Sequence, residues 1–117
     1  MNIEEIRDLC LSLKGVTECF PFDEVTLVFK VGGKMFLLAN LDGDLSINIK
    51  CSPDKAIELR ERYPAVMPGY HMNKQHWNTI MMDGSIGVDA INGWIVDSYN
   101  LIVASLPKSK RMEILNQ

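Results

Sequence analysis

The side chains best suited to chemistry lie in one short segment, residues 63–77, which reads Tyr-Pro-Ala-Val-Met-Pro-Gly-Tyr-His-Met-Asn-Lys-Gln-His-Trp. It contains both histidines of the chain, with an asparagine and a lysine between them. Two prolines and a glycine restrict its backbone, so the segment follows a defined path at low entropic cost. Rigid loops commonly carry binding residues. We therefore predict that this segment offers hydrogen-bond donors to a ligand through His71, Asn73, Lys74 and His76.

The same segment also has a purely structural interpretation, and the residues leave both open. In this interpretation it is a rigid crossover between two halves of one domain. Its large side chains Tyr70, Met72 and Trp77 would then fill the core. Lys74 would face water.

The sequence lacks the motifs that mark catalytic or metal sites. His71 and His76 are one residue further apart than the i, i+4 spacing of a helical zinc pair. Gly-x-Ser-x-Gly, P-loop and Gly-x-Gly-x-x-Gly patterns are missing, as is any Cys-x-x-Cys pair. No base can be identified for the candidate nucleophiles, which are Cys19, Cys51, Ser85 and Ser98. We expect no enzymatic activity, no metal and no cofactor.

Composition indicates one globular domain over residues 1–117, since single domains commonly hold about 100–150 residues. The net charge of -3 and the pI of about 5.3 argue against binding to nucleic acid by bulk charge, although a local basic patch remains compatible with them. The acidic N-terminus does not resemble a signal peptide, and no apolar run reaches the length of a membrane span. We expect a cytoplasmic protein with no membrane partner, and the oligomeric state stays open.

A basic surface is the remaining candidate. Lys30 and Lys34 flank a Gly32-Gly33 hairpin turn, and Lys50 shares the polar face of a predicted strand with serine and asparagine. Together with Lys74, these cations could contact phosphates. An ordinary solvated face is the alternative, because several aspartates lie close by in the sequence.

Periodicity predicts the elements that would position these residues. A first helix starts at Asn2 and stops at Gly15, and residues 17–24 form a connecting segment over the end of the sheet. Strands follow at 26–31, 34–40 and 45–51, then a helix at 53–63, a strand at 76–82 and a helix at 88–106, with a basic tail after it. Cys10 and Cys51 fall on apolar phases and should be buried. The predicted fold is α+β, a two-layer α/β sandwich on an antiparallel sheet.

Several stretches together resemble the MmcQ/YjbR-like family. The most specific one runs from Pro68 to Thr79 and contains the Asn-Lys-x-His-Trp core. Shorter agreeing pieces occur in order along nearly the whole chain, at residues 29–36, 50–53, 83–85, 98–99 and 106–108. One position departs from the pattern: Gly87-Val88 stands where the family has a helix-starting proline.

The resemblance implies a secretion-chaperone-like or frataxin-like sandwich with the order α-β(3)-α-β(2)-α. It also implies a DNA-binding protein with a double wing of β-hairpins, in a family without assigned catalytic residues. The nucleic-acid contacts would then come from Lys30, Lys34, Lys50, His71, Asn73, Lys74 and His76. The competing hypothesis is a protein-interaction module that takes up a partner segment along an edge strand or an apolar groove.

Overall fold

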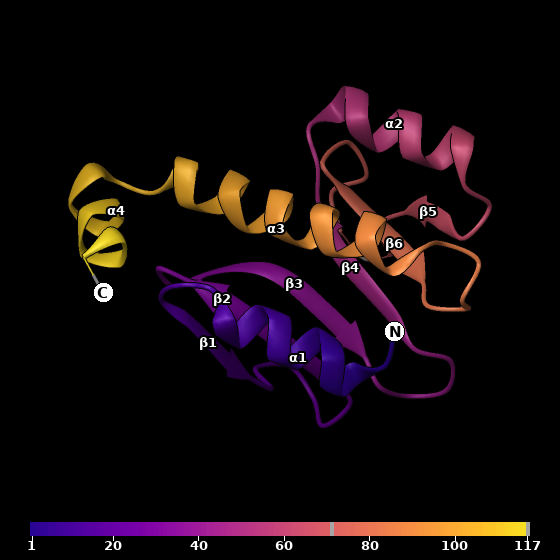
Figure 1. The fold of residues 1–117 in the computed structure, drawn as a ribbon, viewed down its shortest axis with the longest axis horizontal. Helices are drawn as coiled ribbons and strands as arrows, with labels where there is room; N and C mark the ends of the chain where they lie inside the picture. Colours follow the sequence, from indigo (N-terminus) through magenta and orange to yellow (C-terminus); the bar gives the residue numbers. More distant parts are fainter. Residues whose placement is uncertain (71, 117) are drawn as a thin grey trace.

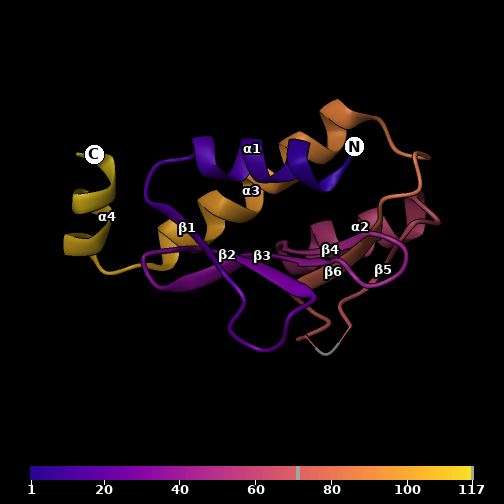
Figure 2. The same ribbon diagram turned by 90° about the horizontal axis from the view of Figure 1, so that it is seen from below.

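The computed structural model describes residues 1–70 and 72–116, and within them it shows one antiparallel sheet of six strands with helices on one face (Figures 1 and 2). The strands are β1 (Val16–Cys19), β2 (Thr26–Val31), β3 (Lys34–Asn40), β4 (Ser46–Lys50), β5 (Val66–Pro68) and β6 (Trp77–Met81). Their order in the sheet is β1-β2-β3-β4-β6-β5. The predicted two-layer α+β architecture is confirmed.

The helices are α1 (Ile3–Ser12), α2 (Pro53–Arg62), α3 (Val88–Ser105) and α4 (Lys108–Leu115). Asn2 caps α1 as predicted, because its Oδ1 accepts the N–H of Glu5 at 2.9 Å while the Glu5 carboxylate accepts the N–H of Asn2 at 3.2 Å. The predicted start of α3 at Val88 is also confirmed. Within the described residues, no helix is long and apolar enough to cross a membrane.

Side chains of the central strands alternate between the helix layer and an uncovered face. In β2, the buried core cluster under the helices includes Leu27, Phe29 and Val31. The opposite phase of β2, which includes Val28 and Lys30, therefore points to the uncovered face. Figure 2 shows the helices on one side of the sheet only. The second face of the sheet thus carries no helix, although Val28 on it is fully buried.

Residues 17–24 were expected to be a connecting segment packed over the end of the sheet, and this prediction is wrong. Val16–Cys19 forms the edge strand β1, which pairs with β2. Propensity alone does not reveal so short a strand; its pairing with β2 and the ion pair between Glu18 and Arg7 of α1 hold it in place. The aromatic side chains that follow do not pack over the sheet, since Phe20 is 49% and Phe22 is 65% exposed.

Ser98 of α3 joins the helix to the sheet where β3 and β4 diverge. The pairing of β2 with β3 skips Phe36 through an irregularity, and the β3–β4 pairing ends at Leu37 opposite Ile49. The fully buried Ser98 hydroxyl donates to the Phe36 carbonyl at 2.6 Å and accepts the Lys50 N–H at 2.9 Å. It therefore satisfies two backbone groups that the ladder leaves unpaired.

Replacing Ser98 by alanine should destabilise the fold by about 1–3 kcal/mol, because both backbone groups would remain buried without a partner. The free energy of unfolding in urea measures this. Ser105→Ala is the matched control, because Ser105 is exposed and its hydroxyl donates only to a carbonyl of its own helix. This substitution should change the free energy of unfolding by less than about 0.5 kcal/mol. Equal effects of the two substitutions would contradict the bridging role of Ser98.

The C-terminal residues were expected to be a basic tail, but they form a helix that packs on the core. α4 begins directly after Pro107, and its Ile114 is only 5% exposed. The preceding residue, Leu106, covers the tip of the β2–β3 hairpin: a Cβ added at Gly32 would lie 2.5 Å from Leu106 Cδ1. Gly32 has a φ of +59°, which also favours glycine. The hairpin tip is therefore held against the end of α3.

This contact predicts different costs for two neighbouring glycine substitutions. Gly33→Ala should cost about 1–2 kcal/mol, because Gly33 has a positive φ but open space around it. Gly32→Ala should cost about 1–3 kcal/mol more, since the buried Leu106 side chain must also move. Thermal or urea unfolding of both variants measures the difference. A Gly32 variant as stable as the Gly33 variant would show that Leu106 does not hold the tip.

Candidate nucleic-acid interface

The β2–β3 hairpin tip, the end of α3 and α4 lie at the same end of the molecule, where the tip contacts Leu106 (Figure 1). Lys34 comes two residues after Gly32, and Lys108 comes two residues after Leu106, so both lie beside this contact. Lys14 reaches the C-terminal end of α4 from the α1–β1 connection, because its Nζ donates to the Leu115 carbonyl at 3.4 Å. We call this surface the basic end; its cations are Lys14, Lys34, Lys108, Lys110 and Arg111. Lys30 pairs with Met35 and points to the uncovered face of the sheet.

The start of α4 is chemically suited to an anion. Pro107 at the N-cap offers no side-chain hydrogen bond, and the helix has no acidic residue in its first turn. The first intrahelical bond runs from the Arg111 N–H to the Pro107 carbonyl at 3.1 Å. The three preceding N–H groups therefore have no intrahelical acceptor, and they lie at the positive end of the helix dipole next to Lys108 and Lys110. A phosphate placed there would meet donors and positive charge together.

Acidic residues gather at the opposite ends of the same strands. Asp23 and Glu24 precede β2, and Asp42 and Asp44 lie in the β3–β4 turn, whereas the basic end lies beyond the far ends of β2 and β3. Charge is therefore separated along the strands in a molecule whose net charge is -3. This separation allows an acidic protein to present a positive surface.

The structure brings together only part of the predicted site. Lys34 belongs to the basic end, whereas Lys30 does not, because it points to the uncovered face of the sheet. Lys50 lies at the end of β4, paired with Trp77 of β6, and also borders a slot between α2 and α3. His71 lies outside the described residues.

The remaining predicted residues bond mainly within their own loop. Lys74 Nζ donates to the Gly69 carbonyl at 3.1 Å, and Asn73 Oδ1 accepts the Gln75 N–H at 2.9 Å. The His76 carbonyl accepts the N–H of Cys51 at 2.7 Å. These bonds support the structural interpretation of the loop for Asn73 and Lys74. The structural interpretation also expected Tyr70 to fill the core, and this is wrong, because Tyr70 is 71% exposed.

A second feature lies on the uncovered face of the sheet, between the β1–β2 loop and the β5–β6 loop. It is a hollow of about 750 Å³ with walls that include Phe22 from one loop and Tyr70 from the other. Thr79 on its floor donates to Asn48 Oδ1 and accepts the Tyr70 N–H at 3.0 Å, which ties the loop to the sheet. Four methionines line it: Met35, Met67, Met72 and Met81. Its charged lining residues are Asp23 and Asp44.

Burial makes the two core cysteines chemically inert. The predicted burial of Cys10 and Cys51 is confirmed. It raises the pKa of the Cys10 thiol to about 12 and that of Cys51 to about 11, so both thiols stay protonated at neutral pH and are poor nucleophiles. Within the described part of the chain, no three His, Cys, Asp or Glu side chains are grouped as metal ligands.

Sequence reasoning missed the contribution of α4 and the hollow. The cations at 108, 110 and 111 were visible, but they were assigned to a tail rather than to an anchored helix. A usable signal was present, because Ile114 and Leu115 follow the cations and can anchor a helix. The methionines of the hollow come from β3, β5, β6 and a loop, and no local pattern connects them.

The β1–β2 loop should lose its internal hydrogen bonds in acid. Asp23 Oδ1 accepts the N–H groups of Val25 at 2.9 Å and Thr26 at 2.7 Å, and these bonds lower the pKa of its carboxyl. A lowered pKa means that the bonds are intact at neutral pH and are lost as the pH falls through that depressed value. In an NMR pH titration, the backbone amide signals of Val25 and Thr26 should shift with a midpoint pH below the ordinary range of aspartate pKa values. Asp23→Asn removes the titrating group and is the control; a midpoint at or above the ordinary range would contradict the assignment.

Comparisons with known proteins agree with this fold over nearly the whole chain. A protein-family model described as YjbR matches residues 11–101. The chain is 38% identical to the protein YbdF of Escherichia coli O157:H7, over 95% of this chain and 92% of that protein. It is 30% identical to the protein YjbR of Escherichia coli strain K12, over 95% of each. The names of these relatives state no activity.

Solved structures show the same architecture. The crystal structure of protein DR2400 from Deinococcus radiodurans matches with a TM-score of 0.91 and 35% identity, over 97% of this chain and 87% of that one. A Pseudomonas syringae protein matches with a TM-score of 0.76 and 26% identity, over 86% of this chain and 98% of that one. The function must therefore be argued from the residues of this chain.

Proposed function

The chain belongs to the YjbR family, and from that premise we propose that it is a non-catalytic DNA-binding protein whose basic end contacts the phosphate backbone. The observation that carries the proposal is the convergence of α4, the hairpin tip and Lys14 on one surface. Phosphate contacts fix a protein on the duplex and come mainly from lysine, arginine and helix N-termini. The basic end offers all three.

The start of α4 supplies the strongest part of this argument. Two lysines lie at the N-terminus of α4, where the positive end of the helix dipole makes their charges unfavourable. No acidic residue in the first turn and no side-chain cap offsets this cost. A DNA phosphate would remove the conflict, because it accepts the free N–H groups and pairs with Lys108 and Lys110. The proposed contacts go to phosphates, which carry no sequence information directly, so the proposed binding is weakly dependent on DNA sequence.

The separated charges also orient the protein on DNA. The acidic turns at 23–24 and 42–44 are repelled by phosphates, whereas the basic end is attracted. The protein would therefore approach with the hairpin tip and α4 foremost.

The proposal predicts a steep salt dependence of binding that depends on specific lysines. Fluorescence anisotropy of a labelled duplex of about 20 base pairs, from about 50 to 200 mM salt, measures the slope of log K against log salt. The double variant Lys34→Ala/Lys110→Ala removes two phosphate contacts, so the magnitude of the slope should fall by about two units. Lys55→Ala removes one charge from α2, away from the basic end, and should leave the slope unchanged.

Two results would overturn the proposal. One is no binding of the duplex at about 50 mM salt, where phosphate contacts are strongest. The other is an unchanged slope in the double variant.

The hollow on the uncovered face favours a second candidate function, the uptake of a protein segment. Its flexible methionines can repack around different apolar side chains, and its two carboxylates favour a segment that also carries basic residues. The two functions predict NMR shifts of different backbone amides when the respective ligand is added. DNA should shift the amides of Lys34 and Lys110, whereas a segment in the hollow should shift those of Met67 and Tyr70.

A further inference from the structure

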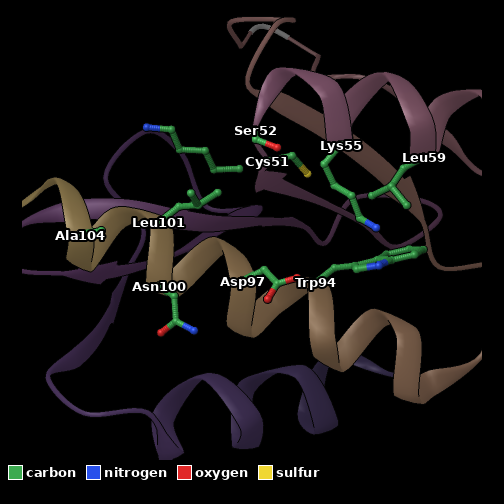
Figure 3. A pocket seen from close by; sticks show the side chains of 10 residues that line it. Cys51, Ser52, Lys55, Leu59, Trp94, Asp97, Asn100, Leu101 and Ala104 are labelled. Atoms are coloured by element: carbon green, nitrogen blue, oxygen red, sulfur yellow. The ribbon is translucent and has the colours of Figure 1, made fainter.

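A slot of about 410 Å³ lies between α2 and α3, on the helix side of the sheet (Figure 3). Its volume is within the range of small-molecule sites. Leu59 of α2 and Trp94 and Leu101 of α3 give it apolar walls. We call it the inter-helix slot; its other lining residues are Lys50, Cys51, Ser52, Lys55, Asp97, Asn100 and Ala104.

Charges of both signs border the slot. The corner between β4 and α2 supplies Lys50, Ser52 and Lys55, and α3 supplies Asp97. Figure 3 shows the Lys55 side chain extending from α2 toward Trp94 of α3. Burial is the main cause that raises the pKa of the Cys51 thiol. Asp97 raises this pKa further and Lys55 lowers it, so both charges act on a residue that lines the slot. The slot therefore combines an apolar wall with a positive and a negative edge.

The charged groups of the slot are available to a ligand. In the described residues, the Asp97 carboxylate and the Lys50 ammonium have no ion pair or side-chain hydrogen bond. Lys55 Nζ lies 3.8 Å from a Glu58 oxygen, but both side chains are exposed and such pairs contribute little. Ser52 makes no side-chain cap bond at the start of α2, so its hydroxyl is also unused.

We propose that the inter-helix slot binds a small zwitterion with an apolar side group, of the class of the apolar α-amino acids. Its carboxylate would face Lys55, its ammonium would face Asp97, and its side group would lie against Trp94 and Leu101. A purely apolar guest would leave these charges unused, and a simple anion would meet Asp97 with the wrong sign. This site is separate from the basic end and does not depend on DNA binding.

Three probes separate the contributions of the charges. L-phenylalanine carries both charges, 3-phenylpropionate lacks the ammonium, and L-phenylalaninamide lacks the carboxylate. Titration of the isotope-labelled full chain to about 20 mM probe is suitable, because small ligands in an open slot bind weakly. We expect saturable shifts at the Trp94 indole N–H and the Cys51 amide. Both analogues should bind about three- to tenfold more weakly than L-phenylalanine, as each loses one exposed ionic contact.

Variants assign each charge to its residue. Asp97→Asn should weaken L-phenylalanine about three- to tenfold, because it loses the partner of the ammonium. It should not weaken 3-phenylpropionate, which has no ammonium and loses a like-charge repulsion. Lys55→Gln should weaken both carboxylate-bearing probes. Asp89→Asn is the control, since it makes the same chemical change on an exposed residue of α3 that does not line the slot. It should change the affinity for neither L-phenylalanine nor 3-phenylpropionate.

Several outcomes would overturn the proposal. Equal affinity for L-phenylalanine and 3-phenylpropionate would exclude a zwitterion site. Shifts confined to residues outside the slot, or no shift up to about 20 mM, would exclude the slot itself at the affinity expected of a small ligand. Unchanged L-phenylalanine binding in Asp97→Asn would remove the role of that carboxylate.

Discussion

The rest of the molecule depends on the position of α3, which packs its apolar side chains on the sheet and bonds it through one buried hydroxyl. Ser98 bonds β3 and β4 at once, at the point where the two strands stop pairing. From there, the C-terminal end of α3 brings Leu106 onto the hairpin tip, and its central turns form one wall of the inter-helix slot. Two surfaces of different chemistry therefore depend on the same helix–sheet contact.

One-sided coverage of the sheet divides the chemistry of the chain. The helix face is apolar apart from a few buried polar groups such as Ser98 and Asn78, whereas the uncovered face combines methionines with amides and hydroxyls. Along the strands, the turns at one end carry carboxylates and the other end carries lysines. The overall charge of -3 is thus a poor description of any single surface, because the antiparallel strands keep the two kinds of charge apart.

Local sequence patterns predicted those elements that are determined by residues close together in the chain. The Gly32-Gly33 turn, the cap at Asn2 and the alternation in β4 each depend on neighbours within a few residues, and each was placed correctly. The strand β1 depends on pairing with β2 and on Arg7, and the hollow depends on loops far apart in the sequence. Such features follow from tertiary contacts, which a single sequence does not display. The bond from the Lys74 ammonium to the Gly69 carbonyl is likewise a contact that the sequence alone does not display.

The energetics of α4 show how an unfavourable charge arrangement is kept in place. Lysines in the first turn oppose the helix dipole, at a cost of about 0.3–1 kcal/mol each. Burial of Ile114 contributes about 1.5–3 kcal/mol, which is enough to offset that cost. The apolar anchor therefore holds α4 on the core, while its cationic start stays exposed beside the hairpin tip. An anion bound there would add to the stability of the helix, so ligand binding and the docking of α4 should favour each other.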